Sequence, residues 1–234
     1  MLMVSFDFFG VSELKNIIEF SICNLGGDMA LKIQDLQTKN KGKPEVAKDY
    51  FDEDQILYWF TQICLALKHC HDRKILHRDI KAQNIFMLKN GMIKLGDFGI
   101  ARVLKCTTEM AATVVGTPYY LSPEIVQSNT YDFKTDIWSI GVLLYEMCAL
   151  RPPFNGQNLH QLAIQIVSGR YTPLDTNRYS PGMIKLVNAL LQVDVEARPS
   201  INELLKFPIL RHRIRQIMSD ELFYEEFSHT VLHQ

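Results

Sequence analysis

The sequence has few cysteines, no paired cysteine motif and almost no net charge. Its five cysteines include no Cys-x-x-Cys arrangement. An odd count without such a pair argues against a disulfide framework and a zinc site, and it favours a reducing compartment. The formal net charge of −1 gives no overall field that would draw the chain to nucleic acid or to a membrane. We therefore expect no nucleic-acid partner.

Long hydrophobic runs are also absent. No apolar stretch is long enough to span a bilayer, so we expect no membrane association. The apolar start, residues 1–9, contains Asp7 and lacks a basic leader region, which makes it a poor signal peptide. The 234 residues, 47% of them hydrophobic, suit a globular protein with one large core or two small ones. These bounds predict a cytoplasmic or nuclear protein.

A glycine-rich phosphate-binding loop is missing as well. No Gly-x-Gly occurs anywhere in the chain, and no Val-Ala-x-Lys strand precedes residue 77. Lys15 lies in a stretch that reads as a surface helix or turn, so we do not expect it to bind a nucleotide. A cluster of lysines between residues 39 and 48 reads as a solvated loop rather than a binding patch.

Three short motifs follow one another in the first half of the chain. Residues 77–84 read HRDIKAQN, residues 97–99 read DFG, and residues 116–124 read GTPYYLSPE. One such motif would be weak evidence, but three in this order within about fifty residues are specific.

The segment between the first two motifs predicts a β-hairpin. Residues 85–88 and 92–95 read as short strands, and Asn90-Gly91 lies between them. Glycine adopts the positive φ that a tight turn needs, so the two runs fold back on each other. The hairpin would place Asn84 and Asp97 side by side at one end.

These motifs resemble the catalytic loop, metal-binding turn and activation-segment end of eukaryotic serine/threonine protein kinases, most closely the NIMA-related kinases. The resemblance implies an α+β, protein-kinase-like fold, mainly the helical C-terminal lobe with a short β-hairpin at the active site. It divides the chain into a remnant or non-native segment with a hinge-like region (1–24), the lobe (25–210) and a basic helix or tail (211–234). The catalytic loop is 77–84 and the activation segment is 97–124.

The resemblance also implies catalytic roles, with ATP and Mg²⁺ as cofactors and proteins as substrates. Asp79 would be the catalytic base and Lys81 would contact the transferred phosphate. Asn84 and Asp97 would bind Mg²⁺, which prefers hard oxygen ligands. Phe86 would form the floor beneath adenine.

Regulation by phosphorylation of the activation segment is a further implication. Arg78, next to the catalytic aspartate, would pair with a phosphate on Thr113, because phosphate adds negative charge that arginine binds. Thr107 and Thr108 are weaker candidates, and Thr117 would orient the catalytic loop.

Other residues are expected to be structural. Asp136 would brace the catalytic loop, and Glu124 would form a buried pair with Arg198. His71 reads as a histidine at a helix end with no chemical role. Capping boxes are predicted at Asp52/Gln55 and Ser200/Glu203. Helices are expected from 26 to 36, 52 to 71, 136 to 150, 158 to 168, 181 to 192, 200 to 207, and from 211 onward.

The resemblance has one gap, since the small N-terminal lobe that supplies the glycine loop and a nucleotide-binding lysine is not matched. We expect a truncated kinase with half a cleft, in which an exposed apolar face is open to a partner. The alternative is a catalytically dead fragment that acts as a protein-interaction module. A small-molecule kinase is a weaker third reading. The family resemblance adds a cytoskeletal location to the cytoplasmic and nuclear ones.

Overall fold

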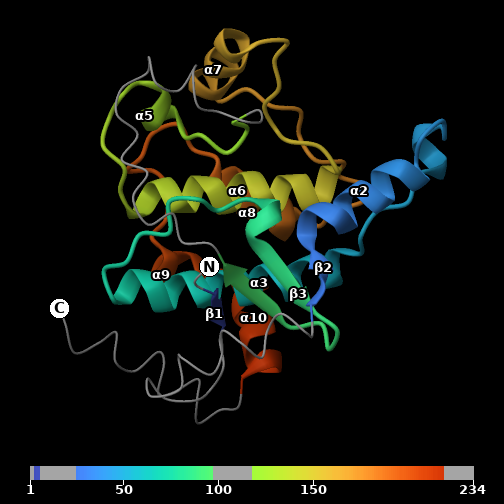
Figure 1. The fold of residues 1–234 in the computed structure, drawn as a ribbon, viewed down its shortest axis with the longest axis horizontal. Coiled ribbons are helices and arrows are strands. Elements are labelled where there is room, and N and C mark those ends of the chain that lie inside the picture. Colours follow the sequence, from blue (N-terminus) through green and yellow to red (C-terminus); the bar gives the residue numbers. More distant parts are fainter. Residues whose placement is uncertain (1–2, 6–24, 97–117, 219–234) are drawn as a thin grey trace.

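The computed structural model describes residues 3–5, 25–96 and 118–218 (Figure 1). Four strands form one antiparallel sheet in the order β1-β4-β3-β2, with β1 at Met3–Ser5, β2 at Leu25–Asp28, β3 at Ile85–Leu88 and β4 at Ile93–Gly96. The α-helices are α2 (Met29–Lys39), α3 (Glu53–Asp72), α5 (Pro123–Val126), α6 (Phe133–Ala149), α7 (Leu159–Ser168), α8 (Pro181–Leu190), α9 (Ile201–Leu204) and α10 (Pro208–Ile217). Two 3₁₀ turns, η2 (Glu45–Ala47) and η3 (Ala82–Asn84), complete the described part.

The predicted hairpin is confirmed as β3 and β4. Ile85 lies opposite Leu95 and Met87 opposite Ile93, and Gly91 in the turn has φ +84°. The four side chains in these two pairs are buried, which fixes the register. The sequence predicted only the two strands of the hairpin, but the sheet has four, because β1 pairs with β4 and β2 pairs with β3. Gly26 and Gly27 lie in β2 and not in the helix that Asp28 caps.

Helix α3 occupies the predicted position and packs against β4, α6, α9 and α10. Its buried side chains repeat at helical spacing, as the sequence predicts (Ile56, Phe60, Ile63, Leu67 and Cys70). The capping box predicted at Asp52 is wrong, because the Asp52 side chain makes no capping hydrogen bond. A tertiary contact holds the first turn instead, since the Glu53 carboxylate accepts hydrogen bonds from the backbone N–H and hydroxyl of Ser180.

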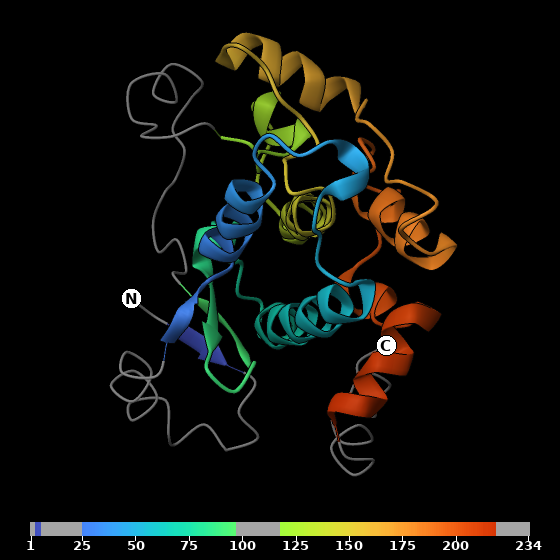
Figure 2. The same cartoon turned by 90° about the vertical axis from the view of Figure 1, so that its right-hand side faces the viewer.

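Helix α6 is the centre of the described part, and Figure 2 shows it nearly end-on with other helices around it. Thirteen of its seventeen residues are buried, as expected for a helix that is apolar all round. It begins three residues before the predicted start at 136, because Asp132 and Thr135 form a capping box there. The helix ends at Ala149, and the C-cap residue Leu150 has a left-handed φ of +53°.

The C-terminal helices are confirmed in part. The capping box of Ser200 and Glu203 is present, but α9 ends at Leu204 and not near residue 207. Helix α10 begins at Pro208, so the expected boundary at residue 210 falls within a continuous helix. Its buried Leu210 and Ile214 lie on the side that packs against α3.

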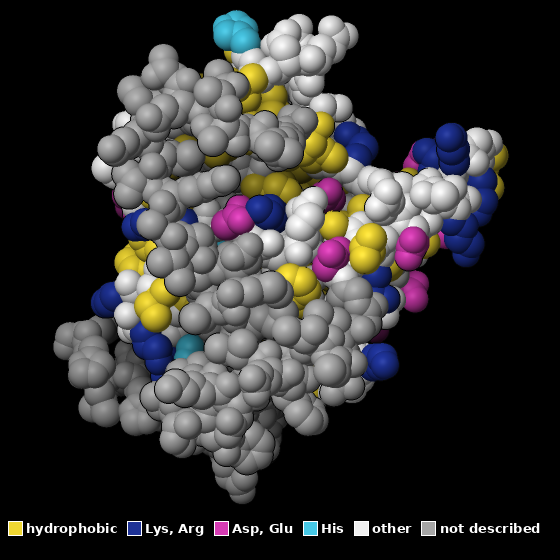
Figure 3. All heavy atoms as spheres, in the orientation of Figure 1, with side chains coloured by type: hydrophobic (Ala, Val, Ile, Leu, Met, Phe, Trp, Pro, Cys, Tyr) yellow, Lys and Arg dark blue, Asp and Glu magenta, His cyan; other side chains and the backbone are white. Residues whose placement is uncertain are grey.

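Ion pairs between Asp49 and nearby lysines hold the lysine-rich segment after α2. Asp49 Oδ2 lies 3.1 Å from Lys39 Nζ and 3.0 Å from Lys43 Nζ. Basic side chains gather at the far end of α2, which projects from the body (Figure 3). No described helix is long and apolar enough to cross a membrane.

Candidate active site

The buried carboxylate of Asp136 holds the loop at residues 77–84 in place. Its two oxygens accept hydrogen bonds from the backbone N–H groups of His77 and Arg78, each at 3.0 Å. The ring of His71 lies 2.9 Å from the same carboxylate, and the Tyr131 hydroxyl donates to it. The prediction that Asp136 braces this loop is thereby confirmed in its geometry. His71 is not a bystander at a helix end, because its ring belongs to the brace.

The brace fixes an unfavourable backbone conformation. Arg78 has φ +70°, a left-handed value that a non-glycine residue rarely adopts. Such a residue persists only where its surroundings hold it. Burial of Asp136 alone would raise the pKa of its carboxyl, but hydrogen bonds from His71 and Tyr131 outweigh burial and hold the pKa below its usual value. Asp136 is therefore a charged acceptor at neutral pH.

Three residues expected to act together lie together on the loop. Lys81 Nζ lies 2.6 Å from Asp79 Oδ2. Asn84 Nδ2 donates to the Asp79 backbone carbonyl at 2.7 Å and to Asp79 Oδ2 at 2.9 Å. The Asp79 side chain is 41% exposed, so its other oxygen is within reach of solvent. Asn84 is buried, and its position is fixed by the 3₁₀ turn η3 that leads directly into β3.

The hairpin places Phe86 on β3, two residues after Asn84. Strand β3 alternates buried and half-buried side chains, so Phe86 lies on the opposite side from Ile85 and Met87. Gly96 ends β4 one residue after Leu95, which pairs with Ile85 beside Asn84. Asp97 and Thr113 lie outside the described residues.

A second tie to the loop comes from Tyr120, which the sequence reading did not single out. Its hydroxyl donates to the Glu146 carboxylate on α6 and accepts a hydrogen bond from the backbone N–H of Ala82 at 3.1 Å. Burial raises the pKa of Tyr120, as does the adjacent Glu146 carboxylate, and burial raises the pKa of Glu146. The sequence feature that could have indicated this contact is Glu146, an acidic residue within an apolar helix, because a buried carboxylate requires a hydrogen-bond partner.

The predicted pair of Glu124 and Arg198 is confirmed. Arg198 Nη1 and Nη2 donate to the two Glu124 oxygens at 2.8 and 2.7 Å, and both side chains are buried. Burial opposes ionisation of Glu124, yet the guanidinium holds the pKa of Glu124 below its usual value. The pair fastens α5, and with it the end of the expected activation segment, to the loop before α9.

Among the described residues, the expected metal ligand is a single amide oxygen and not a complete set of ligands. Within 3–5, 25–96 and 118–218, no group of three histidines, cysteines or carboxylates is placed to hold a metal. The Asn84 amide nitrogen donates to Asp79, and among the described residues no group donates to Asn84 Oδ1. Amide oxygens suit Mg²⁺.

A helical lobe, an antiparallel hairpin and a braced loop carrying aspartate, lysine and asparagine define a protein kinase domain. The chain matches the family model of the protein kinase domain over residues 12–210. It belongs to the protein kinase family, and within that family to the NIMA-related kinases.

The relatives that assign the chain to the NIMA-related kinases are named as serine/threonine-protein kinases. The chain is 56% identical over 183 residues to serine/threonine-protein kinase Nek5 of Homo sapiens, covering 78% of this chain and 26% of that protein. It is 51% identical over 177 residues to Nek1 of Mus musculus, covering 76% and 15%. It is 46% identical over 188 residues to the probable kinase nek3 of Dictyostelium discoideum, covering 79% and 16%. The chain thus spans about a quarter or less of the length of these relatives.

Proposed function

We propose that this chain carries the catalytic loop of a serine/threonine protein kinase, which transfers the γ-phosphate of ATP to serine or threonine hydroxyls of protein substrates. The single observation that carries the proposal is the cluster of Asp79, Lys81 and Asn84, with contacts of 2.6 to 2.9 Å, on a loop braced by Asp136. Phosphoryl transfer depends on positioning and charge more than on covalent help from the protein, and the cluster provides both.

Each residue has a distinct task in this proposal. The half-exposed Asp79 carboxylate accepts the proton of the substrate hydroxyl as that oxygen attacks. Lys81 offers an ammonium group where negative charge develops. Asn84 fixes the orientation of Asp79 through its amide nitrogen, and its amide oxygen would bind Mg²⁺ together with Asp97. When bound, ATP and Mg²⁺ supply the phosphoryl group and neutralise its charge.

Phe86, Arg78 and Thr113 have proposed supporting roles. Phe86 lies on the side of β3 away from the core, and there it would contact the adenine ring. The exposed Arg78 side chain is available to a phosphate, although its backbone is held by Asp136. A phosphate on Thr113 would be its partner and would order the activation segment.

One sequence feature favours a second candidate function. The chain contains no Gly-x-Gly, the loop that covers the nucleotide phosphates in protein kinases. Taken by itself, the chain would then act as a protein-interaction module, with the lobe from residue 25 to the end of α10 at Ile217 as its binding part. A cytoplasmic, cytoskeletal or nuclear location is proposed for either candidate.

Titration with a fluorescent N-methylanthraniloyl ATP in the presence of Mg²⁺ separates the two candidates. The kinase proposal predicts saturable binding that requires Mg²⁺ and weakens in Asn84→Ala. Asn202→Ala, which removes an amide on α9 far from the loop in sequence, is the matched control and keeps full binding. No saturable binding by the chain at millimolar nucleotide would sink the active-enzyme proposal and leave the interaction module.

A further inference from the structure

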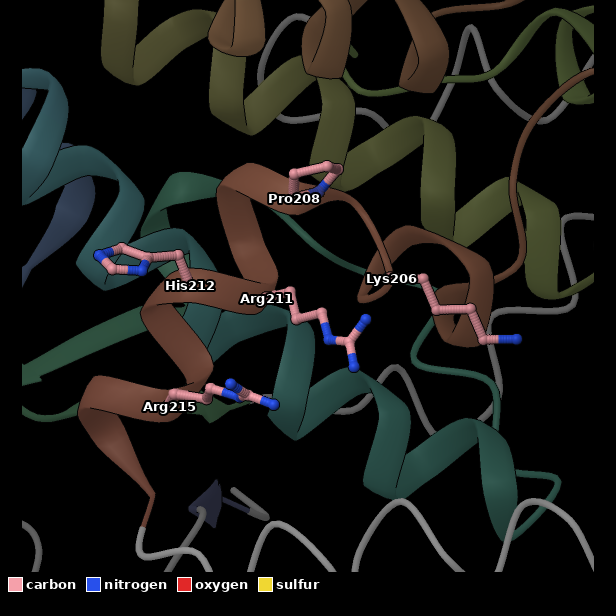
Figure 4. Close-up of a pocket in the computed structure, with 5 residues that line it drawn as sticks. All are labelled: Lys206, Pro208, Arg211, His212 and Arg215. Atoms are coloured by element: carbon pink, nitrogen blue, oxygen red, sulfur yellow. The ribbon is translucent and has the colours of Figure 1, made fainter.

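A basic pocket lies on the surface of the C-terminal helices, away from the proposed active site. Its volume is about 480 Å³, and the residues that line it are Lys206, Pro208, Arg211, His212 and Arg215 (Figure 4). None of the described residues that line this pocket is acidic. A concentration of cationic side chains in a hollow focuses a positive potential and attracts anions.

The spacing along α10 explains why these side chains gather. Residues 208, 211, 212 and 215 fall three and four positions apart, so they share one side of the helix. Leu210 and Ile214 occupy the other side and are fully buried. In Figure 4 the side chains of Arg211 and Arg215 extend to the same side of α10, and Lys206 lies in the preceding turn on that side, with its ammonium group directed away from Arg211.

Not every cation that lines this pocket is engaged within the described part of the fold. Arg213, on the same helix, donates to the Asp54 carboxylate on α3 and so helps to hold α10 in place. Arg211 and Lys206 are exposed, and within the described residues neither side chain makes a hydrogen bond or salt bridge. Arg213 therefore stabilises the fold, whereas Arg211 and Lys206 are available to bind a ligand.

We propose that this basic pocket binds a phosphorylated segment of a partner protein. A phosphate group carries about −1.5 to −2 charges at neutral pH and pairs in a fork geometry with arginine. The pocket is a single compact hollow, whereas duplex nucleic acid requires an extended basic stripe. Among the described residues that line the pocket, only Pro208 is apolar, whereas insertion into a bilayer relies on large apolar side chains. The proposal is independent of catalysis by Asp79.

The test uses a short fluorescein-labelled peptide with one phosphoserine among glycine and alanine, and its unphosphorylated counterpart. Fluorescence polarisation with the full 234-residue chain at about 0.15 M salt limits non-specific attraction. We expect saturable binding of the phosphopeptide alone. The double variant Lys206→Glu/Arg211→Glu should weaken this binding by at least about tenfold, because it replaces two cations with anions.

The matched control is Lys41→Glu/Arg170→Glu, which changes the net charge by the same amount at two exposed positions that lie outside the pocket and off the helices α8 and α10. It should leave the affinity within about twofold, since surface charges beyond a Debye length are screened. Thermal unfolding of both variants checks that each one is folded.

Four results would overturn the proposal. They are no saturable binding, equal binding of the unphosphorylated peptide, an equal loss in the control variant, and binding to phosphatidylserine vesicles without binding to the phosphopeptide. The last of these would identify the pocket as a membrane contact.

Discussion

At the scale of single residues, Asp136 determines the shape of the catalytic loop. Its carboxylate accepts from two consecutive backbone N–H groups, and one of them belongs to Arg78 in its left-handed conformation. Neither His71 nor Tyr131 is on the loop, yet both keep this carboxylate charged and oriented. The conformation of the loop is thus set by residues that would not touch a substrate.

Asp136→Asn should lower the free energy of unfolding by about 2–4 kcal/mol, because an amide cannot accept all of these hydrogen bonds. Denaturant unfolding measures this loss, and Asp35→Asn on the exposed side of α2 should cost less than about 0.5 kcal/mol. Equal effects of the two substitutions would contradict the bracing role.

The same residue predicts a pH dependence. The folded pKa of Asp136 lies below its usual value, so its stabilisation is present above the unfolded pKa of about 3.9 and is lost as the pH falls through the folded value. Between about pH 5 and pH 3, the wild type should therefore lose more stability than Asp136→Asn. Parallel unfolding curves for both proteins over this range would refute the assignment.

Tyr120 gives a second test at this scale. Tyr120→Phe removes the hydroxyl that joins Glu146 to the Ala82 N–H and leaves a buried carboxylate without its donor. The expected cost is about 1–3 kcal/mol of unfolding free energy. Tyr119→Phe is the matched control, because the Tyr119 hydroxyl makes no hydrogen bond within the described residues. Thermal unfolding of the two variants should separate them clearly.

At the scale of elements, the buried pair of Glu124 and Arg198 joins α5 to the segment before α9. Arg198→Met should cost about 3–5 kcal/mol, because Glu124 would stay buried without a counter-charge. Adding Glu124→Gln should restore part of the loss. Arg213→Met breaks an ion pair with the exposed Asp54 and should cost no more than about 1 kcal/mol. A cost for Arg198→Met no larger than for Arg213→Met would contradict the role of the buried pair.

Elements with a local signal were predicted well from the sequence. The hairpin followed from Asn90-Gly91 between two apolar runs, and α6 followed from its unbroken apolar content. The capping box predicted at Asp52 is not formed, and the first turn of α3 is instead bonded through Glu53 to a distant residue, Ser180. The pairing of β1 and β2 with the hairpin also joins segments far apart in sequence, and no local pattern announces it.

The candidate site shows the same division. Asp79, Lys81 and Asn84 lie within six residues, so a motif identifies them together. The support from His71, Tyr120 and Glu146 arises only when α3, the segment before α5 and α6 pack around the loop. The spacing of residues along the chain does not predict such contacts. The acidic Glu146 within an apolar helix does indicate that a partner for its carboxylate lies nearby.

At the scale of the whole molecule, the described part is built outward from α6. The helix carries Asp136 near its start, which bonds the catalytic loop directly, and Glu146 near its end, which is joined to the loop through the Tyr120 hydroxyl. Helix α3 lies against α6 and supports the hairpin and α10. This arrangement puts the proposed active site and the basic pocket on different elements, so each can be altered without the other.

The most direct test of the kinase proposal is phosphoryl transfer from radiolabelled ATP to a protein substrate, with Mg²⁺, comparing the wild-type chain with Asp79→Asn. We predict labelled phosphoserine or phosphothreonine with the wild type, and a loss of at least about a hundredfold in Asp79→Asn without loss of folding. Equal labelling by the two proteins would contradict the assignment of Asp79. No labelling by a wild-type chain that binds the nucleotide would contradict the proposed phosphoryl transfer.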